Sequence, residues 1–172
     1  DKTFPCALLM VRVDGEEPFR AVVGEPDPEG GGGPLRGDEL FDLASLTKPL
    51  GTSLVALKAV ESGSLRLDER LSAYLPDSAC ARNGATVRQV MAHVAGCPAI
   101  PALQRFFPDP ALADRAEAVR RLLAVEPEAA PGVSVVYSCT GFMLLGVALE
   151  RLGGARLAEL FDREVARPLG LS

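Results

Sequence analysis

The chain has 172 residues, a formal net charge of −5 and a hydrophobic content of 48%, which is ordinary for one globular domain or most of one. Its three lysines and fifteen arginines are scattered among acidic residues, which argues against nucleic acid as the main partner. No apolar run approaches the roughly 20 residues that a membrane-spanning helix needs, so we expect no membrane span.

A β-hairpin over about 7–23 is predicted by two apolar runs separated by Asp14-Gly15, a dipeptide typical of hairpin turns. The segment 25–38 is rich in proline and glycine, and it is expected to be a flexible loop. Two strands alone form a marginal sheet. We therefore expect the hairpin either to pair with strands that are not in this chain or to be covered by helices.

The region from about 45 to 170 has the apolar periodicity of helices. Thr86 and Gln89 form a capping box that predicts the start of one of them. Another is almost wholly apolar and is expected to be buried. The predicted helices cover about 45–62, 87–95, 111–125, 140–152 and 155–167.

The cysteines and the single histidine offer little for metal binding. No Cys-x-x-Cys pair occurs among Cys6, Cys80, Cys97 and Cys139, and His93 cannot complete a zinc site with thiols so scattered. We interpret the cysteines as small buried thiols, which slightly favours a cytoplasmic location over a periplasmic or secreted one. We expect no metal and no cofactor. His93 is interpreted as a packed, hydrogen-bonded histidine rather than a catalyst.

Ser45 and Lys48 form a Ser-x-x-Lys pattern at an expected helix start. Residues three apart share a helix face, so the Lys48 amine can reach the Ser45 hydroxyl. That hydroxyl is a good nucleophile only when a base takes its proton, and lysine is such a base only if its pKa falls well below about 10.4. The Ser45 N–H is a candidate for half of an oxyanion hole. The alternative is an N-cap serine followed by a solvated lysine.

Tyr137 lies just before the apolar helix, in Tyr137-Ser138-Cys139. A phenol near a lysine can move protons as a general base. The alternative is a core tyrosine whose hydroxyl is satisfied by a hydrogen bond.

These patterns together resemble the superfamily of class C β-lactamases, penicillin-binding proteins (DD-peptidases) and family VIII-type esterases. Phe41–Pro49 is similar to its nucleophile segment, and Val90–Gly96 to its His-x-Ser-Gly helix end, with Ala95 in place of the serine. Tyr137-Ser138-Cys139 falls where the family has Tyr-x-Asn. Further matches in the same order are Glu61–Asp68, Tyr74–Pro76, Gly141–Glu150 and Pro168–Leu171.

The resemblance implies a serine hydrolase in which Ser45 is acylated and Lys48 and Tyr137 share the base and acid roles. The substrate would be a small amide or ester: a β-lactam, a D-Ala-D-Ala peptide or a simple ester. Cys139 stands where the family has an amide side chain that helps to hold the substrate. Because a thiol is a weak donor and acceptor, Cys139 favours esterase or peptidase activity over β-lactamase activity.

The implied fold class is α+β of the β-lactamase/transpeptidase-like type, with residues 1–172 forming a partial domain of hairpin and helical region. The family's third motif, a Lys/His-Thr/Ser-Gly on a later strand, has no counterpart before Ser172. We therefore expect the C-terminal strands of the sheet to be missing and the isolated chain to be inactive or nearly so. The alternative from another class is a non-catalytic binding or sensor module that keeps the fold, which Ala95 and Cys139 favour slightly.

Overall fold

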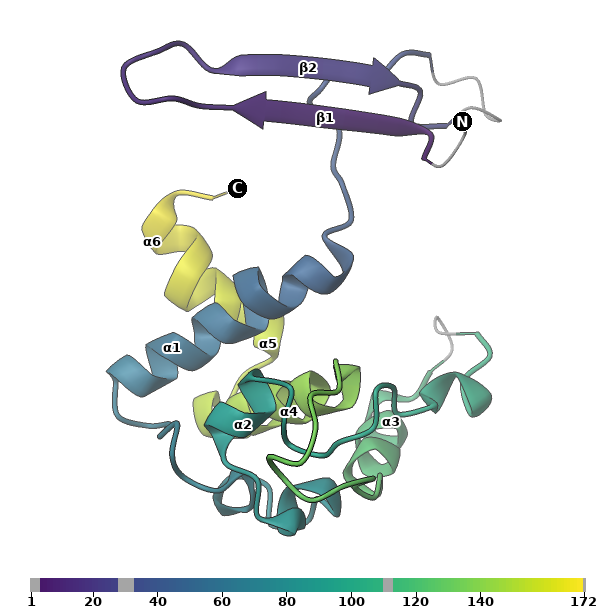
Figure 1. Cartoon of the computed structure of the whole chain (residues 1–172), viewed down its shortest axis with the longest axis vertical. Helices are drawn as coiled ribbons and strands as arrows, with labels where there is room; N and C mark the ends of the chain where they lie inside the picture. Colours follow the sequence, from purple (N-terminus) through teal and green to yellow (C-terminus); the bar gives the residue numbers. More distant parts are fainter. Residues whose placement is uncertain (1–3, 28–32, 110–112, 172) are drawn as a thin grey trace. The chain divides into compact units, whose positions relative to one another are not determined.

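The computed structural model describes residues 4–27, 33–109 and 113–171 (Figure 1). The chain divides into two compact units, Asp1–Leu43 and Ala44–Ser172. The first is here called the hairpin unit and the second the helical unit. No helix in the described residues is long and apolar enough to cross a membrane.

The hairpin unit contains two antiparallel strands, β1 (Cys6–Val11) and β2 (Phe19–Gly24), with Cys6 opposite Gly24. The predicted turn lies between them, and Gly15 has a φ of 82°, which glycine adopts without steric cost. Neither strand contains a buried residue. Part of the loop predicted over 25–38, residues 28–32, lies outside the described residues.

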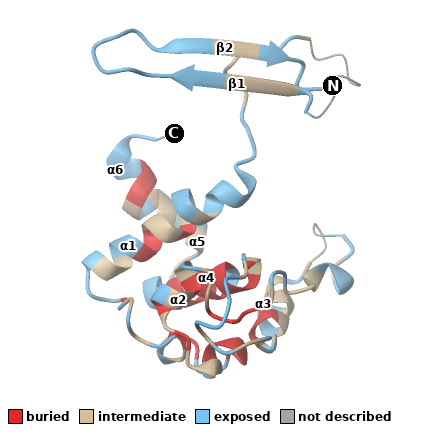
Figure 2. Cartoon of the chain, viewed as in Figure 1, coloured by how far each residue is buried: buried red, intermediate tan, exposed pale blue. Residues whose placement is uncertain are grey.

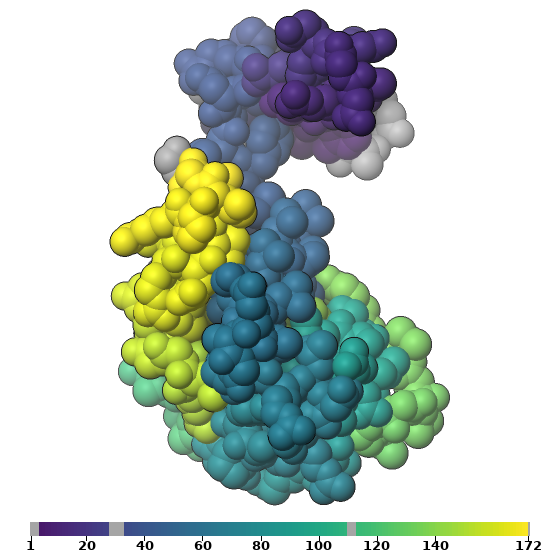
Figure 3. Space-filling view, turned by 90° about the vertical axis from the view of Figure 1, so that its left-hand side faces the viewer, coloured from purple at the N-terminus to yellow at the C-terminus, as the bar shows by residue number. Residues whose placement is uncertain are grey.

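The helical unit begins with an irregular helix. A single 3-10 turn (Ala44–Leu46) leads into a π-helical turn (Lys48–Thr52) and then into α1 (Ser53–Glu61). The other α-helices of the described residues are α2 (Val87–Met91), α3 (Arg115–Leu123), α4 (Cys139–Gly153), α5 (Leu157–Phe161) and α6 (Arg167–Leu169). In Figure 3 the C-terminal segment, drawn in yellow, lies beside the blue α1.

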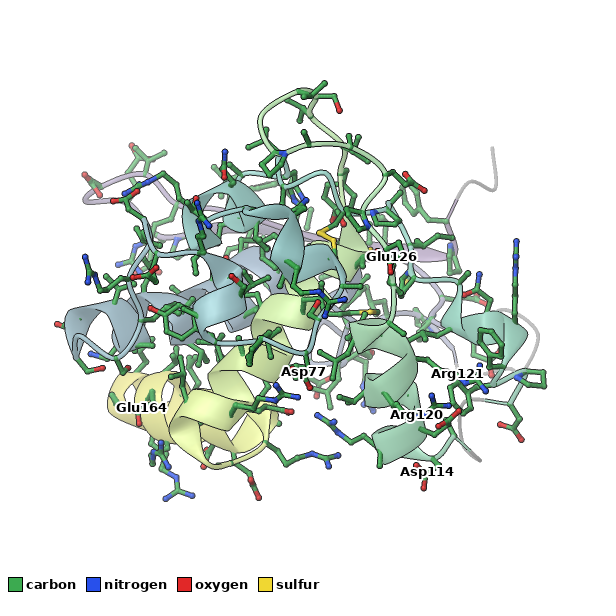
Figure 4. The ribbon with its side chains drawn as sticks, turned by 90° about the horizontal axis from the view of Figure 1, so that it is seen from below. Asp77, Asp114, Arg120, Arg121, Glu126 and Glu164 are labelled. Carbon is green, nitrogen blue, oxygen red and sulfur yellow. A yellow bond between two sulfur atoms is a disulfide. The ribbon has the colours of Figure 1, made fainter. Side chains whose placement is uncertain are left out.

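Side-chain caps set the starts of several helices. The Thr86–Gln89 capping box is confirmed: the Thr86 hydroxyl accepts the Gln89 N–H at 3.2 Å, and the Gln89 side chain accepts the Thr86 N–H at 3.0 Å. α3 begins later than the predicted 111, because Asp114 caps it by accepting the Glu117 N–H at 2.7 Å. Figure 4 shows Asp114 at this end of α3.

The core of the helical unit surrounds α4. Figure 2 shows the buried residues gathered in α4 and in the segments that pack on it. Leu144, Leu145 and Ala148 of α4 are fully buried, as the apolar run in the sequence predicted. The helix is fixed at its start by Ser138, whose hydroxyl oxygen accepts the Gly141 N–H at 3.0 Å. The start of α4 is therefore a rigid place from which to present side chains.

Cys80 and Cys97 form a disulfide, which corrects the interpretation of all four cysteines as thiols. The two residues are 17 positions apart, and nothing in that spacing indicates that the chain returns there. The return is held by Asn83, whose side-chain N–H donates to the Ala95 carbonyl at 2.7 Å. Cys6 and Cys139 are free thiols. The argument for a cytoplasmic location depended on unpaired cysteines and loses its basis.

Candidate active site

Ser45 lies in the first turn of the helical unit, directly after a residue with unusual backbone geometry. Ala44 has a φ of 44°, in the left-handed region that residues other than glycine seldom adopt. Such conformations cost free energy and occur most often at functional sites. The irregular turns of 44–52 place the Ser45 hydroxyl and the Lys48 amine on the same side of the helix start. The Lys48 Nζ donates to Ser45 Oγ at 3.4 Å, so the amine does reach the hydroxyl.

Tyr137 is distant from this pair in the sequence but lies beside it in the structure. The Lys48 Nζ lies 5.0 Å from the centre of the Tyr137 ring, and interactions with Ser45 and Lys48 lower the pKa of the Tyr137 hydroxyl. The Tyr137 side chain is about half exposed, which excludes the alternative of a core tyrosine. The structure thus brings together three side chains that are separated by up to 92 positions in the sequence.

The electrostatics of the three groups favour one proton arrangement. The hydrogen bonds from Ser45 and Lys48 lower the pKa of Tyr137. Burial acts to lower the pKa of Lys48, but hydrogen bonds to Tyr137 and Cys139 outweigh it, so that pKa is raised. The lowered lysine pKa that a Lys48 base requires is therefore not found here. The arrangement favours a charged Lys48 beside a Tyr137 that loses its proton more easily than a free tyrosine.

Cys139 lies next to Lys48, as the fourth member of the predicted site. Cys139 is partly exposed, and its interaction with the Lys48 amine contributes to the raised pKa of Lys48. The Cys139 N–H donates to the Ala99 carbonyl at 2.7 Å, which fixes the segment that carries both Tyr137 and Cys139. All four residues predicted from the sequence thus lie in one cluster within the helical unit.

His93 also lies at this cluster. It is packed and hydrogen-bonded, as predicted: its Nδ1 accepts the Ser138 N–H at 3.0 Å, and its ring centre lies 4.6 Å from that of Tyr137. Burial and the nearby Lys48 charge lower its pKa. Its closeness to Tyr137 was missed from the sequence, because 44 positions separate the two residues and no spacing rule connects them.

A cavity of about 360 Å³ opens beside Lys48 and Cys139. Its wall is mostly apolar and includes Val119 of α3 and Phe142 and Met143 of α4. A volume of this size is in the range of small-molecule sites. Within the described ranges, no three His, Cys, Asp or Glu residues are grouped so that they could hold a metal ion.

Comparisons with known proteins show which family and fold the chain resembles. A model of the Beta-lactamase family matches residues 1–172. A putative D-alanyl-D-alanine carboxypeptidase of Escherichia coli is 30% identical over 146 residues, which cover 77% of this chain and 33% of the relative. Esterase EstB of Burkholderia gladioli is 31% identical over an alignment of 180 positions, and the match covers 96% of this chain and 45% of the relative. The chain therefore spans between a third and a half of these relatives' length.

A solved structure supports the same fold. EstCE1, described as a hydrolase with promiscuous acyltransferase activity, superposes with a TM-score of 0.72 at 26% identity. The match covers 90% of this chain and 44% of that one.

Proposed function

The chain belongs to the beta-lactamase family, and from that premise we propose that it carries the nucleophile and the proton-transfer groups of an acyl-transferring serine hydrolase. The predicted α+β fold of the β-lactamase/transpeptidase-like type is confirmed by the family match and the superposition. The proteins compared above include one named as a putative carboxypeptidase, one named as an esterase and one described as a hydrolase, so hydrolysis is the coarse activity of the family. Ser45 is the proposed nucleophile.

The observation that carries this proposal is the 3.4 Å hydrogen bond from Lys48 Nζ to Ser45 Oγ, with the Tyr137 ring centre 5.0 Å from the same nitrogen. A nucleophilic hydroxyl needs a base within hydrogen-bond reach. Tyr137 is the better base of the two, because its pKa is lowered while that of Lys48 is raised. We therefore assign the base to the Tyr137 oxygen and the stabilising charge to the Lys48 ammonium.

The proposed reaction has two steps. Ser45 Oγ attacks the carbonyl carbon of the substrate as its proton moves to the Tyr137 oxygen, and Tyr137 then gives that proton to the leaving oxygen or nitrogen. The product is an ester between the acyl group and Ser45. In the second step Tyr137 takes a proton from water, the hydroxide oxygen bonds to the acyl carbon, and the proton returns to Ser45 as its ester bond breaks.

Cys139 and the neighbouring cavity narrow the proposed substrates. A thiol beside Lys48 offers the substrate weaker hydrogen bonds than an amide side chain does. An apolar cavity at the same place suits a substrate with an apolar group next to its reacting carbonyl. We propose simple esters and small peptides as substrates ahead of β-lactams.

The test is the intact mass of the protein after incubation with a fluorophosphonate or a penicillin, made at the full length that its gene encodes. We expect one stable adduct on the wild type, none on Ser45→Ala, and an unchanged adduct on Ser134→Ala, which replaces an exposed serine of the helical unit. The 172-residue chain alone is expected to give little or no adduct. A folded full-length protein without any adduct would overturn the proposal in favour of a non-catalytic binding module.

A further inference from the structure

His93 bonds to the chain on both sides of Tyr137. Its Nδ1 accepts the Ser138 N–H at 3.0 Å, and its backbone carbonyl accepts the Val136 N–H at 2.9 Å. The Tyr137 ring rests against the imidazole, with ring centres 4.6 Å apart. One residue therefore fixes the backbone before and after the tyrosine as well as one face of its ring. The proposed reaction uses no atom of His93, so it does not explain why these contacts are present.

The backbone of His93 is itself held in an uncommon conformation. Its φ is 60°, in the left-handed region, where histidine, asparagine and aspartate are the most frequent residues other than glycine. The His93 N–H donates to the Val90 carbonyl at 3.1 Å, which ties it to the end of α2. The ring also packs on Phe142 of α4, with ring centres 5.1 Å apart. The residue thus connects α2, α4 and the Tyr137 segment.

The hydrogen bond from Ser138 fixes the proton state of the imidazole. A ring nitrogen that accepts an N–H cannot carry a proton, so neutral His93 holds its proton on Nε2. Protonation of Nδ1 would place two N–H groups against each other and break this bond. The titratable groups that face His93 are Lys48, whose charge opposes protonation, and Tyr137, whose ring lies against the imidazole.

We propose that His93 is the positioning residue for the base: neutral His93 holds Tyr137 at Ser45 through Ser138 and Val136, and protonated His93 releases it. This inference depends on the proposed function for its effect on rate. Its geometric part does not, because the hydrogen bond and the tautomer exist whether or not Ser45 is acylated.

The geometric part is tested by NMR of the 172-residue chain. His93 is its only histidine, so the imidazole nitrogen signals need no assignment by mutation. We expect an unprotonated Nδ1 and a protonated Nε2 at pH 7.5, and a shift of the Ser138 amide signal that follows protonation of the ring. A proton on Nδ1 at pH 7.5, or a Ser138 amide signal that does not shift when the ring is protonated, overturns the inference.

The effect on rate is tested with two substitutions in the full-length protein. His93→Asn keeps an acceptor at the position of Nδ1, tolerates the left-handed backbone and does not titrate; His93→Ala removes the acceptor and the ring. Because a misplacement of about 1 Å can cost 10²-fold, we expect His93→Ala to lower kcat by roughly 10- to 100-fold with KM nearly unchanged. We expect the kcat of His93→Asn to stay within about threefold of the wild-type value. That change is smaller than the loss of a positioning contact would cause.

The pH profile separates positioning from a merely structural role. In the wild type kcat should fall as pH falls for two reasons, because both the Tyr137 oxygen and His93 become protonated; His93→Asn should keep only the part that belongs to Tyr137. Equal losses of kcat in both variants, or a pH profile of His93→Asn that matches the wild type, would overturn the inference while leaving the proposed function intact. A wild type without acylation would instead overturn the proposed function, and the NMR result would still decide the geometry.

Discussion

The two units of this chain differ in how completely they bury their apolar side chains. In the hairpin unit, both strands contain only partly or fully exposed residues, and Leu9, Met10 and Phe19 are more than half exposed. In the helical unit, α4 and its neighbours enclose a core with many fully buried side chains. All four predicted site residues and His93 belong to the helical unit. The unit with a complete core therefore also holds the whole candidate site.

The largest expected effect is on the rate of Ser45 acylation, and it comes from a substitution at Tyr137 that leaves both units folded. Tyr137→Phe keeps the ring against His93 and removes only the hydroxyl that contacts Ser45 and Lys48. Because general base catalysis contributes about 10²- to 10⁴-fold, we expect the rate of Ser45 acylation to fall by that factor. The measurement is the rate of adduct formation by mass spectrometry. Tyr74→Phe is the matched control, since that hydroxyl accepts the Arg66 N–H away from the site. An unchanged rate in Tyr137→Phe would remove the tyrosine from the base role.

The difference in burial predicts a difference in stability. Leu145→Ala empties a fully buried position of α4, and such substitutions lower the free energy of unfolding by about 2–5 kcal/mol. Leu9→Ala removes the same atoms from a half-exposed position of β1, where we expect less than about 1 kcal/mol. Urea unfolding followed by circular dichroism measures both. Equal losses would mean that the hairpin is buried in solution and would break the comparison.

The sequence predicted the elements of the two units but not the contacts that complete the site. Period and turn signals gave the hairpin, the apolar α4 and the Thr86 cap, because these depend on residues close together in the chain. Resemblance to a family brought Ser45, Lys48, Tyr137 and Cys139 into one hypothesis.

What local patterns could not predict was long-range: the Cys80–Cys97 disulfide and the packing of His93 on Tyr137. The sequence also could not predict that the pKa of Lys48 is raised. It depends on hydrogen bonds with Tyr137 and Cys139, which only the fold brings within reach.

The disulfide sharpens the comparison further, because it lies in the helical unit alone. A crosslink that closes a loop of about this length stabilises a protein by roughly 3 kcal/mol in the chain-entropy description. We expect a reductant to lower the free energy of unfolding of the wild type by about 2–4 kcal/mol. The double substitution Cys80→Ser with Cys97→Ser should start at the lower value and not respond to the reductant. A response in the double variant would assign the effect to other thiols, Cys6 or Cys139.

The smallest effect is the pH dependence that His93 gives to stability. Burial and the Lys48 charge lower its folded pKa below 6.5, so the unfolded chain binds a proton more readily than the folded one. Stability should therefore fall as pH drops from 7 through 6.5 towards the folded pKa. The carboxyls of Asp77 and Glu117, whose pKa values are lowered by hydrogen bonds from Arg151 and Arg120, titrate well below this range.

Urea unfolding at pH 7.5 and pH 5.5 measures this slope, with His93→Asn as the non-titrating control. The wild type should lose more stability than His93→Asn between the two values. Parallel slopes would mean that His93 is as easily protonated in the folded chain as in the unfolded one. The imidazole would then not be held neutral by burial and the Lys48 charge, and its part of the loss of kcat would begin at higher pH.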